Sequence, residues 1–152
     1  MHFTTATLLT TLLSTLALAA PAPAAASKSM MASTAQWTIE QAKRVCDAAD
    51  TSCAWSFTIN KHVAGVASTP CAFTTPKDGA TPASQSPQTG ATCGGFQVTT
   101  GWSGQFGPGN GFTTLAVVDL ANRLITYPAY TDVQLAGGKV VVPDQSYAPY
   151  SI

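Results

Sequence analysis

Few side chains in this sequence can perform acid–base chemistry. The chain has 152 residues but only two histidines, seven Asp and Glu residues, and seven Lys and Arg residues. His2 lies in a leader segment that we expect to be removed, which leaves His62 as the candidate general base. His62 follows Asn60-Lys61 at the end of a predicted strand, where a solvated turn is the usual environment. A Ser/His/Asp triad is therefore not expected.

The acidic residues offer a second route to catalysis, because a hydrolase with paired carboxylates needs two of them about 5–10 Å apart. Asp47 and Asp50 lie in a turn and are expected to bind backbone amides, and Asp119 precedes a predicted hairpin turn. Asp132 and Asp144 lie near tyrosines and could converge in the fold. We predict that the protein is not an enzyme and needs no cofactor. A hydrolase built on Asp132 and Asp144 is the remaining catalytic alternative.

The four cysteines, Cys46, Cys53, Cys71 and Cys93, are the other reactive side chains. They contain no C-x-x-C pair and no Cys/His metal spacing, so disulfides are expected and a metal site is not. Three pairings are possible. Cys46–Cys53 with Cys71–Cys93 is favoured, because both bridges are local and leave each predicted strand intact. In a chain-entropy treatment, closed loops of about 8 and 23 residues add roughly 2.5 and 3.4 kcal/mol, so reduction should loosen or unfold the protein.

The N-terminal segment explains how such bridges could form. Residues 8–20 are an apolar run of 13 residues without charge. Such a run is too short for a bilayer, which needs about 20 residues, and is typical of a secretory signal. Ala17-Leu18-Ala19 supplies small residues for cleavage, although no Lys or Arg precedes the run. We predict a signal peptide at residues 1–19, a flexible Ala/Pro/Ser arm at 20–35, a single domain at 36–152, and a secreted, extracellular product.

Short strands are expected to position these side chains. Alternation of apolar and polar residues predicts strands in residues 37–45, 53–60, 96–102, 115–120 and 123–127. In the first strand, Trp37, Ile39 and Val45 should share the inward face. The last two strands flank a turn at 121–122, and a further hairpin is predicted over 134–143 around Gly137-Gly138. The pattern predicts an all-β domain with little helix, a single small disulfide-stabilised β-barrel or, alternatively, a β-sandwich.

Two loops interrupt the strands and are the candidates for recognition. Residues 74–92 contain three prolines, which excludes a central strand. Residues 101–111 contain five glycines but lack the spacing of a phosphate loop. Because loops on a rigid scaffold commonly carry binding function, we predict the recognised surface in 74–92 first and 101–111 second. With neighbouring aromatic and acidic residues, the candidate surface comprises Lys77, Asp78, Gln85, Gln88, Trp102, Phe106, Tyr130, Asp132, Tyr147 and Tyr150.

The charge balance excludes several classes of partner. The net charge is zero, the pI is about 6.7 and only 9% of residues are charged. Nucleic acids and anionic membranes both need a basic excess, so neither is expected as a partner. No second long apolar segment follows the leader, so membrane insertion is not expected either. The tyrosines near the C-terminus, with Trp102 and Phe106, could stack on sugars, which makes a cell-wall carbohydrate-binding protein the alternative function. They could equally pack the ends of the barrel.

Four runs carry a resemblance to a known group of proteins. They are CDAADTSCAWSF (46–57), CGGFQVTTGWSGQFG (93–107), LITYPAYTD (124–132) and VVPDQSY (141–147). Together with the leader and the four cysteines, these runs resemble the small secreted fungal protein elicitors, among them the hypersensitive-response-inducing elicitor of the rice blast fungus. The resemblance implies a monomeric, disulfide-bonded β-barrel that is secreted into the host apoplast. It also implies perception by a plant receptor or other host protein, followed by cell death and defence responses.

Overall fold

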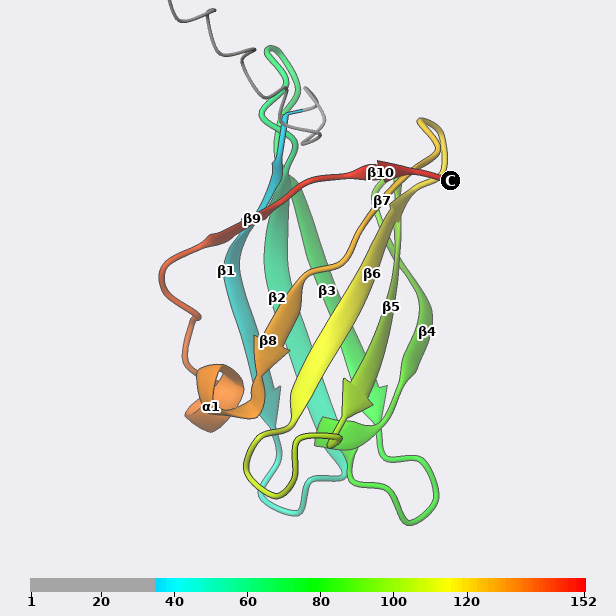
Figure 1. Cartoon of the computed structure of the whole chain (residues 1–152). Coiled ribbons are helices and arrows are strands. Elements are labelled where there is room, and N and C mark those ends of the chain that lie inside the picture. Colours follow the sequence, from blue (N-terminus) through cyan, green and yellow to red (C-terminus); the bar gives the residue numbers. More distant parts are fainter. Residues whose placement is uncertain (1–34) are drawn as a thin grey trace, which may run out of the picture. The chain divides into compact units, whose positions relative to one another are not determined.

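The strands of the chain form two antiparallel sheets (Figure 1). The computed structural model describes residues 35–152, so the predicted signal peptide and the arm up to residue 34 lie outside the described residues. In chain order the strands and helices are β1 (Trp37–Cys46), β2 (Ser52–Asn60), β3 (Thr69–Pro76), the 3-10 turn η1 (Ala83–Gln85), β4 (Gln88–Cys93), β5 (Phe96–Ser103), β6 (Phe112–Asp119), β7 (Leu124–Thr126), β8 (Ala129–Thr131), α1 (Asp132–Leu135), the 3-10 turn η2 (Ala136–Gly138), β9 (Gln145–Tyr147) and β10 (Tyr150–Ser151).

The order of strands makes the fold sandwich-like. One sheet has the order β3-β2-β1-β9, and the other has the order β10-β7-β6-β5-β4, with β8 also paired to β6. On one side of the molecule β3 and β4 each end a sheet, and no ladder of hydrogen bonds joins them within residues 35–152. A closed barrel would need that ladder. The predicted barrel is therefore wrong, and the alternative of a sandwich describes the fold better. Prolines at 70 and 76 suit β3 to an edge position.

The two disulfides have the favoured pairing, which is confirmed. Cys46 and Cys53 close the β1–β2 hairpin, with their Cα atoms 3.9 Å apart. Cys71 of β3 is bonded to Cys93 of β4, with Cα atoms 4.9 Å apart. This second bridge therefore links the two sheets covalently on the side where no backbone ladder links them.

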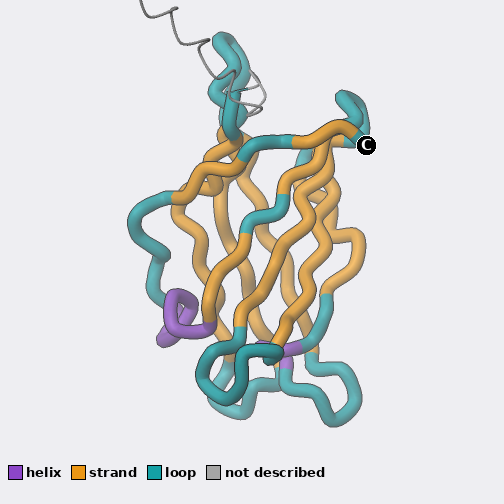
Figure 2. Tube along the Cα trace, in the orientation of Figure 1, coloured by secondary structure: helices purple, strands orange, loops and turns teal. Residues whose placement is uncertain are grey.

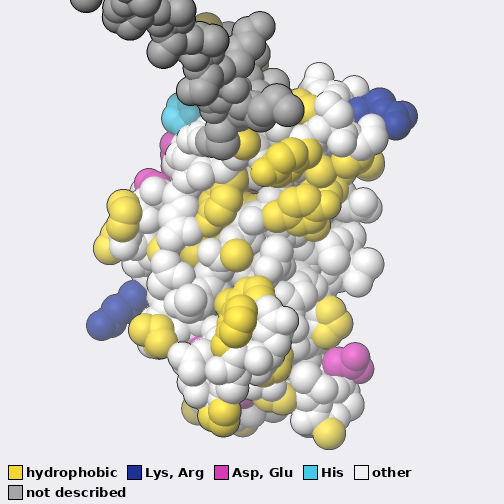
Figure 3. All heavy atoms as spheres, viewed as in Figure 1, with side chains coloured by type: hydrophobic (Ala, Val, Ile, Leu, Met, Phe, Trp, Pro, Cys, Tyr) yellow, Lys and Arg dark blue, Asp and Glu magenta, His cyan; other side chains and the backbone are white. Residues whose placement is uncertain are grey.

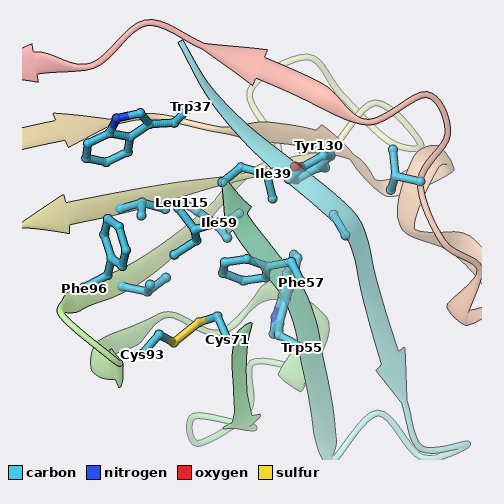
Figure 4. Close-up of a cluster of buried hydrophobic side chains, with 14 of the residues drawn as sticks. Trp37, Ile39, Trp55, Phe57, Ile59, Cys71, Cys93, Phe96, Leu115 and Tyr130 are labelled. Carbon is cyan, nitrogen blue, oxygen red and sulfur yellow. A yellow bond between two sulfur atoms is a disulfide. The ribbon is translucent and has the colours of Figure 1, made fainter. Parts of the chain in front are cut away.

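The core lies between the sheets (Figure 4). The alternation predicted for β2 is confirmed, because Trp55, Phe57 and Ile59 are all buried. They pack in one cluster with side chains from β5 and β6 of the facing sheet, including Phe96 and Leu115. Burying large apolar side chains in this way contributes about 1.5–3 kcal/mol for each of them.

A bulge in β1 reverses which residues face the core. The pairing of β1 with β2 shifts register between Glu40 and Lys43, and Gln41 has a φ of 54°. One extra residue in a strand moves all later side chains to the opposite face. Trp37 and Ile39 are buried as predicted, but beyond the bulge Arg44 is buried and Val45 is 45% exposed. The prediction of an inward Val45 is therefore wrong.

The two predicted C-terminal hairpins have different outcomes. The first is confirmed, because β6 pairs with β7 across the turn at 120–123. The second, over 134–143, is wrong, since α1 and η2 occupy its first half. Thr131 and Gln134 form a capping box, in which each side chain binds the other residue's backbone N–H. This pair satisfies free backbone N–H groups at the start of a helix, so the segment forms a helix rather than a strand.

Candidate functional site

Three loops and α1 meet at one end of the sandwich, which we call the loop end. The loops are residues 47–51, 77–87 and 104–111, which lie at the bottom of Figure 2 in teal, apart from the short η1 in purple, with α1 in purple at the lower left. Backbone hydrogen bonds join the first two loops, from Lys77 N–H to Thr51 O at 2.9 Å and from Ala83 N–H to Asp50 O at 2.9 Å. The third loop is joined to α1, because Asp132 N–H donates to Gly111 O at 2.9 Å. Of the two loops singled out in the sequence, residues 77–87 and 104–111 lie at this end, while residues 74–76 belong to β3, 88–92 to β4 and 101–103 to β5.

A single buried cation connects these segments. The Arg44 guanidinium donates from Nη1 to Ser84 O at 2.8 Å and to Thr113 Oγ1 at 3.3 Å. Its Nη2 forms an ion pair with Asp132 Oδ1 at 3.4 Å. The same group lies 5.6 Å from the centre of the Trp55 ring, which suits a cation–π contact. Arg44 thus ties β1 to η1, β6 and α1. Sequence reasoning missed Arg44, because the alternation pattern without a bulge placed it outward.

Asp132 is the second centre of this network. Its Oδ2 accepts a hydrogen bond from Trp102 Nε1–H at 3.0 Å, while Oδ1 faces Arg44. Gly111 lies directly against both partners: a Cβ at this position would overlap Asp132 Oδ2 and would lie 2.7 Å from the Trp102 ring. The carboxylate of Asp132 is thus held by structural partners. Asp144, the other member of the hypothetical catalytic pair, accepts instead from Gln41 N–H at 2.8 Å.

The hairpin loop at 47–51 is stabilised by its own acids, as predicted. Asp47 Oδ1 accepts from Ala49 N–H at 3.0 Å and from Thr51 N–H at 2.9 Å, and Thr51 Oγ1 donates to Asp47 Oδ2 at 2.6 Å. The hydroxyl bond from Thr51, together with these amide bonds, lowers the pKa of Asp47 below its ordinary value. Asp50 accepts from the Ser84 N–H and hydroxyl, which joins the hairpin loop to η1 a second time.

The predicted recognition residues divide into four groups, of which Tyr130 alone forms the last. Lys77, Asp78 and Phe106 are exposed at the loop end. Gln85, Gln88, Trp102, Asp132 and Tyr147 are partly buried. Tyr150 is exposed on β10, away from the loop end (Figure 1).

Tyr130 is the predicted surface residue that lies inside the core, with only 1% of its surface exposed. Burial raises the pKa of its hydroxyl above the ordinary value, and the neighbouring Tyr147 adds to this. The tyrosines therefore do not form one sugar-stacking platform, and Tyr130 packs inside as the alternative interpretation expected.

Replacing Gly111 by alanine should disturb the loop end while keeping every charged side chain. The added Cβ overlaps both Asp132 and the Trp102 ring, so we expect a loss of about 1–3 kcal/mol in the free energy of unfolding. Gly101→Ala is the matched control, because a Cβ there meets no atom within 4 Å. Urea denaturation of both variants measures the difference, and equal midpoints would refute the close packing described here.

A second ion pair lies at the opposite end of the sandwich. Lys61 Nζ is 2.9 Å from Asp119 Oδ2 and 5.5 Å from the centre of the Phe96 ring. Burial by itself raises the pKa of Asp119, but hydrogen bonds from Asn122 and Lys61 outweigh it, so the pKa lies below its ordinary value. His62, the one histidine among the described residues, is exposed nearby, and its Nε2 is 2.6 Å from Thr38 Oγ1.

Protonation of Asp119 at acidic pH should lower the free energy of unfolding. A carboxylate whose pKa is lower in the folded than in the unfolded chain stabilises the fold above the unfolded value of about 3.9. That contribution to stability is lost as the pH falls through the lower pKa that the group has in the folded chain. We expect Asp119→Asn to lower the free energy of unfolding by about 1 kcal/mol at neutral pH and to reduce the loss of stability below about pH 4. Melting curves against pH test this, with the exposed Asp78→Asn as the control. Identical acid profiles for wild type and Asp119→Asn would contradict it.

One group of side chains in residues 35–152 brings together atoms of the kind that bind metals. Ligand atoms of Cys46, Asp50 and Cys53 lie within 4.8 Å of one another, but both sulfurs belong to a disulfide, so neither is a thiolate ligand. Among residues 35–152 no helix has the length and hydropathy needed to cross a membrane.

These features define a class: a small disulfide-bonded β-sandwich that presents a set of internally braced loops. The comparisons with known proteins agree with it. The family model Effector TSP1 matches residues 38–152. A relative described as "Effector TSP1", from Hypocrea virens, is 51% identical over 136 residues, which cover 90% of this chain and 88% of the relative. The chain belongs to the Effector TSP1 family. It is therefore a fungal effector, and its family and two disulfides indicate a secreted protein.

Proposed function

We propose that the protein acts in the host apoplast as an elicitor, and that a plant receptor or other host protein perceives its loop end. Perception then triggers hypersensitive cell death and defence responses, as the resemblance to the rice blast elicitor implies. The observation that carries the proposal is the construction of the loop end. Exposed Lys77, Asp78 and Phe106 lie on loops that Arg44, Asp50 and Asp132 hold from inside. A preorganised surface of this kind loses little conformational entropy on binding.

The proposal is one of recognition without catalysis by a monomer. The described carboxylates with the strongest contacts bind backbone amides, hydroxyls or cations, as Asp47, Asp119 and Asp132 do. Such contacts hold the surrounding backbone and side chains in place. The sparse charge also provides little long-range steering, so recognition should depend on shape and on short-range contacts.

Leaf infiltration of the chain from residue 20 onward tests the proposal. We expect the native protein to cause an oxidative burst and local cell death. The same protein, reduced and alkylated, should cause neither, because the loop end depends on a folded sandwich. Expression in leaves with and without the signal peptide distinguishes the compartment, and only the exported form should be active. Absence of any response to the native protein, or equal activity of a form retained inside the cell, would overturn the proposal.

A further inference from the structure

A small apolar pocket lies beneath Phe106 at the loop end. It has a volume of about 240 Å³ and is lined by Phe106, Asn110, Phe112, Ala129, Tyr130 and Thr131. Phe112 and Thr131 are register partners in the β6–β8 pair, so they form the floor, and Phe106 approaches from the loop above. In Figure 3 apolar side chains gather over this junction of β8 with the β5–β6 loop, while charged side chains lie toward the margins of the face.

Phe106 is held in place although most of its ring is in solvent. Its side chain is 67% exposed, and its ring centre lies 5.7 Å from that of Phe112. Two turns close the loop around it, from Gly107 N–H to Gly104 O at 3.0 Å and from Asn110 N–H to Gly107 O at 3.1 Å. The Asn110 side chain also donates to Phe106 O at 3.3 Å. An exposed aromatic ring on a braced loop has the properties of an interface hot spot, since little of its freedom remains to be lost on binding.

The surroundings of the pocket define what it can hold. The sequence from residue 101 to 118 contains no charged side chain, and no charged residue lines the pocket. A charged group would lose its hydration there and gain no partner, so the occupant is uncharged and apolar. The volume is below the roughly 300–1,000 Å³ typical of small-molecule sites and above the roughly 150 Å³ that accommodates benzene. It therefore matches one apolar side chain.

We propose that this pocket receives a single leucine, isoleucine or phenylalanine side chain of the plant protein that perceives the effector, with Phe106 as the anchor. The proposal rests on the proposed function, because that function supplies the partner. It assigns the binding energy to the 104–111 loop and β8, and leaves Lys77 and Asp78 at the rim of the interface, where charged groups contribute less.

Three variants test the pocket. Phe106→Ala removes the anchor, and Ala129→Leu fills the pocket while leaving the anchor in place; both positions are exposed, so the fold should persist. Leu120→Ala is the matched control, since Leu120 is 60% exposed on the turn at the opposite end. We expect the dose for half-maximal cell death to rise about tenfold or more for the first two variants and to stay unchanged for the control.

A binding measurement separates this proposal from the proposed function. N-acetyl-leucine amide and N-acetyl-phenylalanine amide, titrated at millimolar concentration, should shift the NMR signals of Phe106, Phe112 and Ala129. Chitohexaose and laminarihexaose should not. Shifts caused by the sugars alone, or a concentration-dependent dimer that Phe106→Ala abolishes, would overturn the proposal. Full leaf activity of both pocket variants would overturn it while leaving the proposed function intact. An inactive native protein that still binds the amides would refute the function and preserve the apolar pocket.

Discussion

Replacing Cys71 and Cys93 together by alanine is expected to lower the free energy of unfolding by about 3.4 kcal/mol, the chain-entropy value for the closed loop. The loop spans 22 positions and includes η1 and β4. A change of this size corresponds to a melting temperature roughly 10–15 °C lower for a domain of this length. The physical reason extends beyond loop closure, because this bridge is the covalent link between β3 and β4 on the side where no ladder joins the sheets.

The Cys46/Cys53 double alanine variant is the control for that prediction. Its bridge closes a loop of only 7 positions, between strands that already pair along their length. The chain-entropy value is about 2.5 kcal/mol, and the hairpin keeps its register without the bridge. We therefore expect a smaller loss of stability and no separation of the sheets. Differential scanning calorimetry measures both. Equal melting temperatures for wild type and the Cys71/Cys93 variant, or a larger loss for the hairpin variant, would contradict the role assigned to the inter-sheet bridge.

Arg44→Ala is the second change with a large expected effect, a loss of about 3 kcal/mol in the free energy of unfolding. The side chain is buried, and its removal leaves Ser84 O and the Thr113 hydroxyl without their donor. Asp132 loses its cation, although its partly exposed carboxylate keeps the Trp102 bond. Arg44→Lys should lose an intermediate amount, because an ammonium group cannot reach three acceptors in the planar arrangement that a guanidinium offers.

The residues whose amides exchange faster in Arg44→Ala distinguish a loss of this hydrogen-bond network from a general loss of packing. Amide hydrogen exchange in Arg44→Ala should speed up at residues 83–86 and 111–113, which include the guanidinium partners Ser84 and Thr113, before it does in the β2 core. Lys43→Ala is the control, since Lys43 lies next to Arg44 but faces outward and should change stability by less than about 0.5 kcal/mol. Exchange that accelerates uniformly, or not at all, would show that the loop end does not depend on Arg44.

These two changes differ in what they should do to recognition. Loss of the inter-sheet bridge weakens the whole sandwich, so the elicitor activity that we propose should fall in proportion to the folded fraction. Loss of Arg44 loosens the loop end in a molecule that is still folded. Activity should then fall at temperatures where circular dichroism still reports native strands. Comparison of the two variants in leaves would therefore separate dependence on the fold from dependence on the loop end.

Local signals in the sequence account for the parts of the fold that were predicted correctly. The strand β2, the β6–β7 hairpin and the pairing of the cysteines each follow from residues close together in the chain. The helix α1 had a local signal too, the Thr131 and Gln134 capping box, which the glycine pair at 137–138 obscured. The bulge at Gln41 had no such signal, because Gln is an ordinary strand residue and its φ of 54° results from the register with β2.

The sequence by itself determined which reactive side chains are scarce and which are present: one histidine beyond the predicted signal peptide, few charged residues, four cysteines and segments that alternate in hydrophobicity. Only the tertiary structure decided that the sheets form a sandwich, that Arg44 lies inside, and that loops from three regions form one surface. The reason is the length scale of the interactions. Arg44 contacts Ser84, Thr113 and Asp132, which lie 40, 69 and 88 positions further along the chain. A one-residue bulge decides whether it can reach them, because it reverses the face to which a strand directs every later side chain.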